Sequence, residues 1–209
     1  MSFIKPRSTA TTRDRLLTAA EVAILDKGFA ATSIEELIAE VGITKGGFFY
    51  HFKDKSALVE AILERHLIAE EDWLDGLFAR AAEETTEPLA QFLVFLRLLR
   101  DQMAALPDVH PGCLIAATCF QERLFTRTVH DLARQNLLNW RARFHARLTA
   151  IAQIHPPHGK VELEALADML VVLVDGAIIL SKTVQEKDAL PRQIALYEIF
   201  VAEVFRGAG

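Results

Sequence analysis

The sequence has few of the residues that build disulfide-rich, repetitive or disordered proteins. Its 209 residues include two cysteines, seven prolines and ten glycines, scattered without any low-complexity segment. The cysteines, Cys113 and Cys119, are too few for a disulfide framework and fit a reducing compartment. Apolar residues make up 51% of the chain, which is enough to build a hydrophobic core. The composition therefore favours an ordinary globular protein.

Long apolar runs are also lacking. The most apolar stretch covers residues 169–180; it is too short to cross a bilayer and contains Asp175. Residues 1–15 hold no apolar segment of the kind that a secretion signal needs. We therefore expect no membrane contact and a cytoplasmic location.

Common enzyme motifs are missing. The sequence has no GxSxG, no phosphate-binding loop, no HExxH and no dinucleotide-binding glycines. Cys113 and Cys119 are six positions apart, which would place them on different sides of a helix and not on one metal ion. We expect no enzyme activity, no catalytic residues, no metal and no cofactor.

Positive charge is scarce, and its distribution matters more than its sum. The net charge is −5, which by itself argues against nucleic acid. Residues 1–55, however, hold eight Lys or Arg and seven Asp or Glu, so this segment is slightly basic and the remainder is acidic. The stretch 43–53 contains Lys45, His51 and Lys53 and no acid. A small basic tip on an acidic body can still approach DNA phosphates.

The feature that dominates the sequence is helical periodicity of the apolar residues, without a convincing alternating run. It predicts an all-α protein of about nine helices. Turn and cap signals, among them Gly28, Gly42 and Pro88, separate the helices. The predicted helices cover about 12–27, 33–40, 45–51, 55–81, 87–106, 113–124, 127–154, 161–186 and 191–206.

Residues 33–52, SIEELIAEVGITKGGFFYHF, predict a helix-turn-helix. Thr32 with Glu35 and Ser33 with Glu36 form two overlapping capping boxes, and Thr44 can cap the second helix. Gly46 and Gly47 would each cost about 1 kcal/mol in a helix interior relative to Ala. That cost is understandable if the backbone must approach another molecule closely.

The segment KGFAATSIEELIAEVGITKGGFFYHFKDKSALVEAIL, residues 27–63, resembles the signature of the TetR family of transcriptional regulators. The resemblance implies a DNA-binding domain at 1–55 and an effector-binding and dimerisation domain at 56–209. It implies a cytoplasmic repressor that binds double-stranded DNA at a palindromic operator and is released by an unknown small molecule.

Carried over by position, the resemblance assigns phosphate contacts to Thr32, Ser33 and Lys55. Thr44, Lys45, Gly46 and Gly47 would lead the recognition helix into the major groove, and Tyr50 and His51 would touch the DNA backbone or a base. These roles suit hydroxyl groups, helix starts and Lys. The sequence departs from the family at Ile38, at Gly47 and at Phe49, which also lies on the expected DNA face; the last two departures remove hydroxyl groups.

The last two predicted helices, 161–186 and 191–206, are expected to form a homodimer. Each carries an apolar stripe that fits a four-helix bundle, although core packing within one subunit would give the same pattern. The stripes are Leu163, Leu166, Leu170, Val174, Ala177 and Ile178, and Ile194, Tyr197, Val201, Val204 and Phe205.

An effector pocket would lie among the middle helices, although its residues also suit an ordinary core. Asp175 interrupts an apolar run and would bind a polar group of the effector or tie helices together. Cys113 is the candidate for an alternative, a regulator that senses oxidants or electrophiles. The expected pocket residues are Phe92, Phe95, Cys113, Phe120, Trp140, Phe144 and Asp175.

Overall fold

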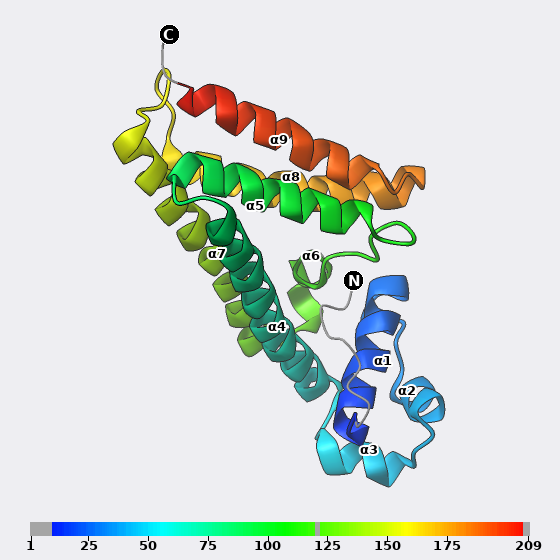
Figure 1. Ribbon diagram of the computed structural model, residues 1–209. Coiled ribbons are helices and arrows are strands. Elements are labelled where there is room, and N and C mark those ends of the chain that lie inside the picture. Colours follow the sequence, from blue (N-terminus) through cyan, green and yellow to red (C-terminus); the bar gives the residue numbers. More distant parts are fainter. Residues whose placement is uncertain (1–9, 120–121, 207–209) are drawn as a thin grey trace. The chain divides into compact units, whose positions relative to one another are not determined.

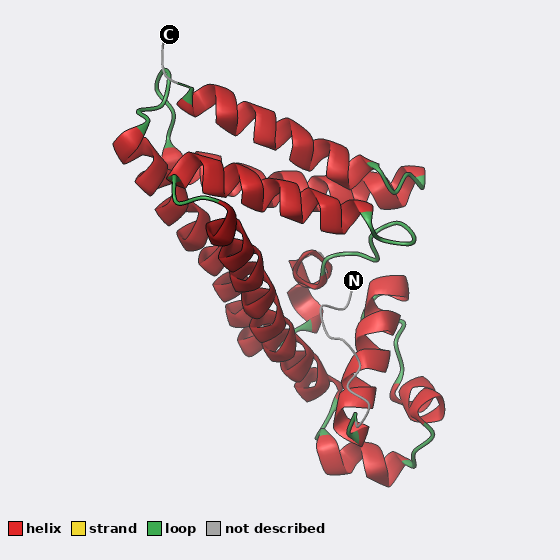
Figure 2. Ribbon diagram, viewed as in Figure 1, coloured by secondary structure: helices red, strands yellow, loops and turns green. Residues whose placement is uncertain are grey.

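The computed structural model describes residues 10–119 and 122–206, and all regular structure in these ranges is helical (Figure 2). It confirms the predicted all-α fold. No helix in this part of the chain is long and apolar enough to span a membrane. The helices, labelled in Figure 1, are α1 (Thr12–Lys27), α2 (Ile34–Val41), α3 (Lys45–His51), α4 (Lys55–Glu84), α5 (Pro88–Ala104), α6 (Leu114–Cys119), a short 3₁₀ helix (Glu122–Leu124), α7 (Arg127–Ile154), α8 (Leu163–Val184) and α9 (Ala189–Phe205).

Helix boundaries differ from the predictions mainly at the ends. α5 stops at Ala104, where the approach of Pro107 disfavours further helix, since a residue before proline avoids helical dihedrals. α6 is much shorter than the predicted 113–124; it starts after Cys113, whose Sγ accepts the Ala116 N–H at 3.4 Å. α8 stops at Val184 because Gln185 takes a left-handed conformation with φ 58°.

The chain divides into two compact units. The first contains residues up to Glu71 together with Pro111–Asn136, and the second contains Asp72–His110 and the residues from Leu137 onward. Both α4 and α7 pass from one unit into the other. These compact units do not correspond to the two functional domains predicted at 1–55 and 56–209. That functional boundary stays a prediction.

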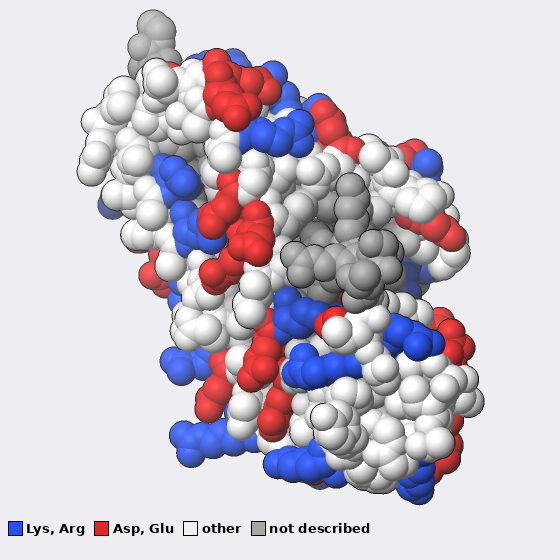
Figure 3. Space-filling model, turned by 60° about the horizontal axis from the view of Figure 1, so that its bottom comes forward, with Lys and Arg blue, Asp and Glu red and all other residues white. Residues whose placement is uncertain are grey.

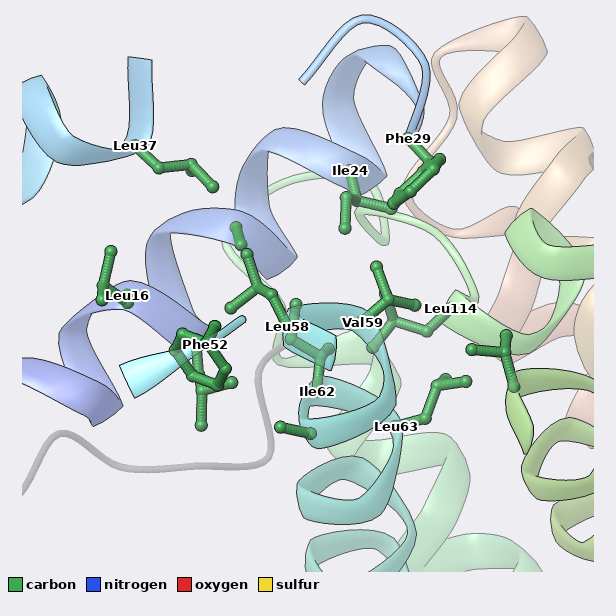
Figure 4. Close-up of a cluster of buried hydrophobic side chains, with 14 of the residues drawn as sticks. Leu16, Ile24, Phe29, Leu37, Phe52, Leu58, Val59, Ile62, Leu63 and Leu114 are labelled. Atoms are coloured by element: carbon green, nitrogen blue, oxygen red, sulfur yellow. The ribbon is translucent and has the colours of Figure 1, made fainter. Parts of the chain in front are cut away.

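A continuous apolar core holds the first unit together. Side chains from α1, α2, α4 and α6 point toward one another in this core (Figure 4). Phe29, in the loop after α1, packs on Phe125 with ring centroids 4.7 Å apart. The amino-terminal helices are therefore fixed to the first turns of α4 by hydrophobic burial.

A buried polar contact adds to this packing. Arg65 of α4 donates hydrogen bonds to Glu21 at 2.7 Å and to the Thr18 hydroxyl at 3.1 Å, both on α1. Glu21 is buried, so loss of Arg65 would leave an uncompensated carboxylate. The pair therefore ties α1 to α4 independently of the apolar core.

The second unit is built from α5, α8 and α9 with parts of α4 and α7. α9 packs against both α5 and α8 (Figure 1). Phenylalanine rings fill its interior: Phe78 and Phe95 stack with centroids 4.1 Å apart, and Phe92 and Phe144 lie against Phe95. Tyr197 is buried and donates a hydrogen bond to the Leu166 carbonyl at 2.8 Å.

The apolar stripes predicted for the dimer interface belong to this interior, which corrects the sequence-based interpretation. Nine of the eleven stripe residues are buried within the chain, and Leu163 and Val174 are half-buried. Ordinary core packing, the alternative left open by the pattern, accounts for them. The surface of α8 and α9 that faces away from this core is also rich in apolar residues, which the predicted stripes did not include.

Two neighbouring phenylalanines of α3 offer a test of the fold. Phe48 is 0% exposed and Phe49 is 45% exposed. Phe48→Ala is expected to lower the free energy of unfolding by about 3–5 kcal/mol, the usual cost of deleting a buried ring. Phe49→Ala, the matched control, should cost far less. Chemical denaturation of both variants measures the difference, and equal losses would contradict the described orientation of α3.

Candidate nucleic-acid interface

The turn between α2 and α3 has the geometry that the helix-turn-helix prediction requires. Gly42 adopts a left-handed conformation, φ 73° and ψ 41°, which glycine accepts without strain. The Ile38 carbonyl accepts the N–H groups of Gly42 at 2.9 Å and Ile43 at 3.0 Å. These bonds satisfy the end of α2 and redirect the chain into α3. Leu37 and Val41 are buried in the core of the first unit.

Side-chain caps fix where the two helices begin. The Ser33 hydroxyl accepts the Glu36 N–H at 3.1 Å, and the Thr44 hydroxyl accepts the Gly47 N–H at 3.1 Å. Both caps were expected from the sequence. The second expected capping box, Thr32 with Glu35, is wrong, because the Thr32 hydroxyl donates to the Gly28 carbonyl at 3.0 Å instead.

The short helix α3 has one face in the core and one face outside it. Phe48 is its buried anchor, and Phe52 packs just behind it. On the other side Tyr50 is 85% exposed, Phe49 is partly exposed, and His51 packs edge-on against Tyr50. Thr44, Lys45 and Gly46 are exposed at the start of the helix. Most residues expected to meet DNA on α3 are therefore brought together on one surface.

The paired glycines of α3 are not required by the packing of the chain. A Cβ at Gly46 would lie 3.8 Å from Thr44 Oγ1, and a Cβ at Gly47 would lie 3.6 Å from Ile43 Cβ and Thr44 Oγ1. These are ordinary contacts, and neither glycine has a positive φ. Since glycine destabilises a helix relative to alanine, its presence here needs a reason outside the chain.

Two residues expected to contact phosphate are engaged inside the first unit. Thr32 is buried, so its hydroxyl is not presented at the surface. The Lys55 ammonium donates to the Phe29 carbonyl and lies 4.0 Å from the centre of the Phe29 ring. Burial lowers the pKa of Lys55 from its ordinary value. In this structure both residues stabilise the loop that leads into α2.

The charges around the helix-turn-helix are partly paired. Lys45 of α3 forms an ion pair with Glu35 of α2 at 3.1 Å, and Lys27 of α1 forms one with Glu36. Figure 3 turns the end of the first unit that carries α3 in Figure 1 toward the reader. Its surface is largely uncharged there, with both basic and acidic side chains around the margin.

The residues expected to form an effector pocket fall into different units. Phe92, Phe95, Trp140 and Phe144 are buried in the second unit and pack on one another. Asp175, on α8, is half-buried in the same unit. Cys113 is half-buried in the first unit, and Phe120 lies outside the described residues. The four aromatic residues are thus together, in a packed core.

The sequence did not predict two contacts that position the helices around the helix-turn-helix. Arg65 and Glu21 are 44 positions apart, and Lys45 and Glu35 are ten positions apart across a turn. Neither pair has the i, i+3 or i, i+4 spacing that reveals an ion pair along one helix. The hydrophobic pattern that predicted α1 and α4 gives their inward faces but not which polar groups meet.

Together, the turn, the two capped helices and the exposed face of α3 define a helix-turn-helix unit. This region, residues 16–62, matches the family described as bacterial regulatory proteins, tetR family. The match shows that residues 16–62 are similar to the amino-terminal region of TetR-family regulators, which are generally not enzymes. Over 84 residues the chain is 34% identical to the HTH-type transcriptional repressor KstR2 of Mycolicibacterium smegmatis. That match covers 40% of this chain and 39% of the repressor, so the chain spans only about two fifths of the repressor's length.

Solved structures show that the likeness in fold covers nearly the whole chain. A TetR-family transcriptional regulator from Agrobacterium tumefaciens superposes with a TM-score of 0.75 at 20% identity, covering 93% of this chain and 97% of that one. The reduced form of Escherichia coli NemR gives a TM-score of 0.73 at 22% identity, covering 89% and 94%. Neither these relatives nor the surroundings of Cys113 favour cysteine sensing over the principal interpretation.

Replacing Gly47 tests how much stability α3 loses by having glycine at this position. Gly47→Ala is expected to raise the free energy of unfolding by up to about 1 kcal/mol, because alanine is the better helix former and its Cβ has room. Thermal or urea unfolding of the purified variant measures this. A loss of stability would mean that Gly47 serves the fold and not an external contact.

Proposed function

We propose that this chain is a sequence-specific DNA-binding transcriptional regulator, a cytoplasmic repressor that releases its operator when a small molecule binds. The observation that carries the proposal is the exposed face of α3. This face is held by the buried Phe48 and presents Lys45, the two glycines and Tyr50 within the region that matches the family.

The proposed contacts follow from what is exposed. α3 enters the major groove, where the missing side chains of Gly46 and Gly47 let its backbone approach the groove closely. Phe49 and Tyr50 offer apolar surface to thymine methyl groups, and the Tyr50 hydroxyl and His51 reach bases or phosphates. Lys45 and the Ser33 hydroxyl meet phosphates. Thr32 and Lys55 act through the loop that they stabilise, unless DNA draws the Lys55 ammonium away from Phe29.

A homodimer through α8 and α9 completes the proposal, with an interface different from the predicted stripes. Outward-facing residues on each helix repeat at helical spacing and are largely apolar. Gly176 sits among them, and a Cβ there would meet nothing within 4 Å, so another helix could approach closely. The exposed apolar residues include Met169, Val172 and Ile179 on α8 and Leu196, Ile199 and Phe200 on α9.

The effector is the least constrained part of the proposal. An apolar interior that suits an apolar or aromatic molecule is formed by the rings of Phe92, Phe95, Trp140 and Phe144. Because these rings pack on one another, they would have to move apart to admit the effector. Release then follows as a population shift. The dimer binds DNA only in the conformation whose two recognition helices are spaced to fit two successive major grooves. An effector that binds the other conformations more tightly lowers the fraction of dimers that can bind DNA.

Selection from a DNA library tests the proposed function. The purified protein is incubated with random duplexes at several salt concentrations, and the retained fragments are sequenced. We expect a palindrome with half-sites about one helical turn apart, roughly 34 Å. Tyr50→Ala should abolish the enrichment while leaving the protein folded, and Gly47→Ala should weaken it while stabilising the protein. A folded dimer that enriches no sequence at low salt would contradict the proposal.

The interface is tested by placing a charge on it. Val172→Asp is expected to convert the dimer into a monomer at micromolar concentration, because a buried unpaired carboxylate opposes association. The matched control is Val22→Asp on α1, where the valine is 61% exposed against 71% for Val172. Analytical ultracentrifugation distinguishes the two. An unchanged dimer in Val172→Asp would place the interface elsewhere.

A further inference from the structure

The ion pair between Glu35 and Lys45 lies on the surface that would meet DNA. Glu35 belongs to the first turn of α2, and Lys45 is the first residue of α3. Their side chains are 67% and 63% exposed, and Glu35 Oε1 lies 3.1 Å from Lys45 Nζ. Because Thr32 bonds to the Gly28 carbonyl, the capping role expected for Glu35 is not used, and its carboxylate is directed to Lys45 instead.

The Glu35 carboxylate and a DNA phosphate would compete for the Lys45 ammonium. The Glu35 backbone N–H and then Lys45 lower the pKa of Glu35, so its carboxylate is charged at neutral pH. A phosphate that binds Lys45 must displace this carboxylate, which then lies unpaired close to the polyanion. An exposed ion pair is weak enough for such an exchange to be reversible.

We propose that Glu35 is a positioning residue that limits DNA affinity: it holds Lys45 in the free protein, and DNA must displace it. This inference rests on the proposed function and deepens it. The carboxylate lowers the effective positive charge of the interface by one. Binding that depends on phosphate contacts alone is thereby weakened, and more of the total affinity must come from contacts to bases.

Two acidic neighbours on α2 provide matched controls. Glu36 also forms an ion pair, less exposed than that of Glu35, but with Lys27 of α1 and not with the recognition helix. Glu40 is exposed on the same helix and has no ion pair with any described residue. Replacing either by Gln changes the net charge by the same amount as Glu35→Gln does.

The test compares Glu35→Gln with these controls by fluorescence anisotropy, on operator DNA and on unrelated duplex, from low to moderate salt. Glu35→Gln should strengthen binding about two- to fivefold, the size of an exposed ion pair. The slope of log affinity against log salt should become steeper by up to about 0.9, one phosphate contact. In a Lys45→Gln background the same substitution should have little effect, because its partner is gone.

Several outcomes would overturn the inference while leaving the proposed function intact. One is equal strengthening by Glu35→Gln and Glu40→Gln, which would be a plain net-charge effect. Another is a Glu35→Gln effect that persists without Lys45, and a third is an unchanged salt slope. Failure of the folded wild-type protein to bind any duplex would instead overturn the proposed function, and this inference with it.

Discussion

The burial of Phe48 is the constraint on which the candidate DNA-binding surface depends. α3 has seven residues, two of them glycine, and a helix this short is not stable alone in water. Its conformation therefore comes from packing: the Phe48 ring is fully buried in the core shared with α1 and α4. Once Phe48 is fixed, helical geometry directs Phe49 and Tyr50 away from the core, and Lys45 is exposed at the start of the helix. Stability and recognition are thus separated on two faces of a helix of about two turns.

Much of the polar chemistry near this surface supports its shape. Arg65 clasps α1, Lys55 holds the loop after α1, and Thr32 closes the same loop. Lys55 and Thr32, which the family resemblance assigns to phosphate contacts, here hold in place the elements that carry the other expected contacts. A substitution at any of them would change DNA binding indirectly, through the position of α2.

How far the sequence predicts this protein depends on the kind of interaction. Apolar periodicity and cap residues gave the helices, because hydrophobic burial and capping leave regular local patterns, as at Ser33, Thr44 and Gly42. The pattern could not distinguish the two apolar faces of α9, since Tyr197 faces the core and Ile199 faces outward only two positions later. Nor could it pair Glu35 with Lys45, because the contact is made across a turn whose path is tertiary information.

The same reasoning explains why an acidic chain can carry a DNA-binding tip. Net charge is a sum over the whole chain, whereas phosphates meet only the groups within about a Debye length, roughly 8–10 Å. Around α3 those groups include Lys45 and Lys53, and of the acids nearby Glu35 is already paired with Lys45. The Glu35 carboxylate, which lowers the positive charge of this surface, also links Lys45 of α3 to α2. Charge scarcity at this surface therefore favours binding in which shape and base contacts carry a larger share than phosphate attraction.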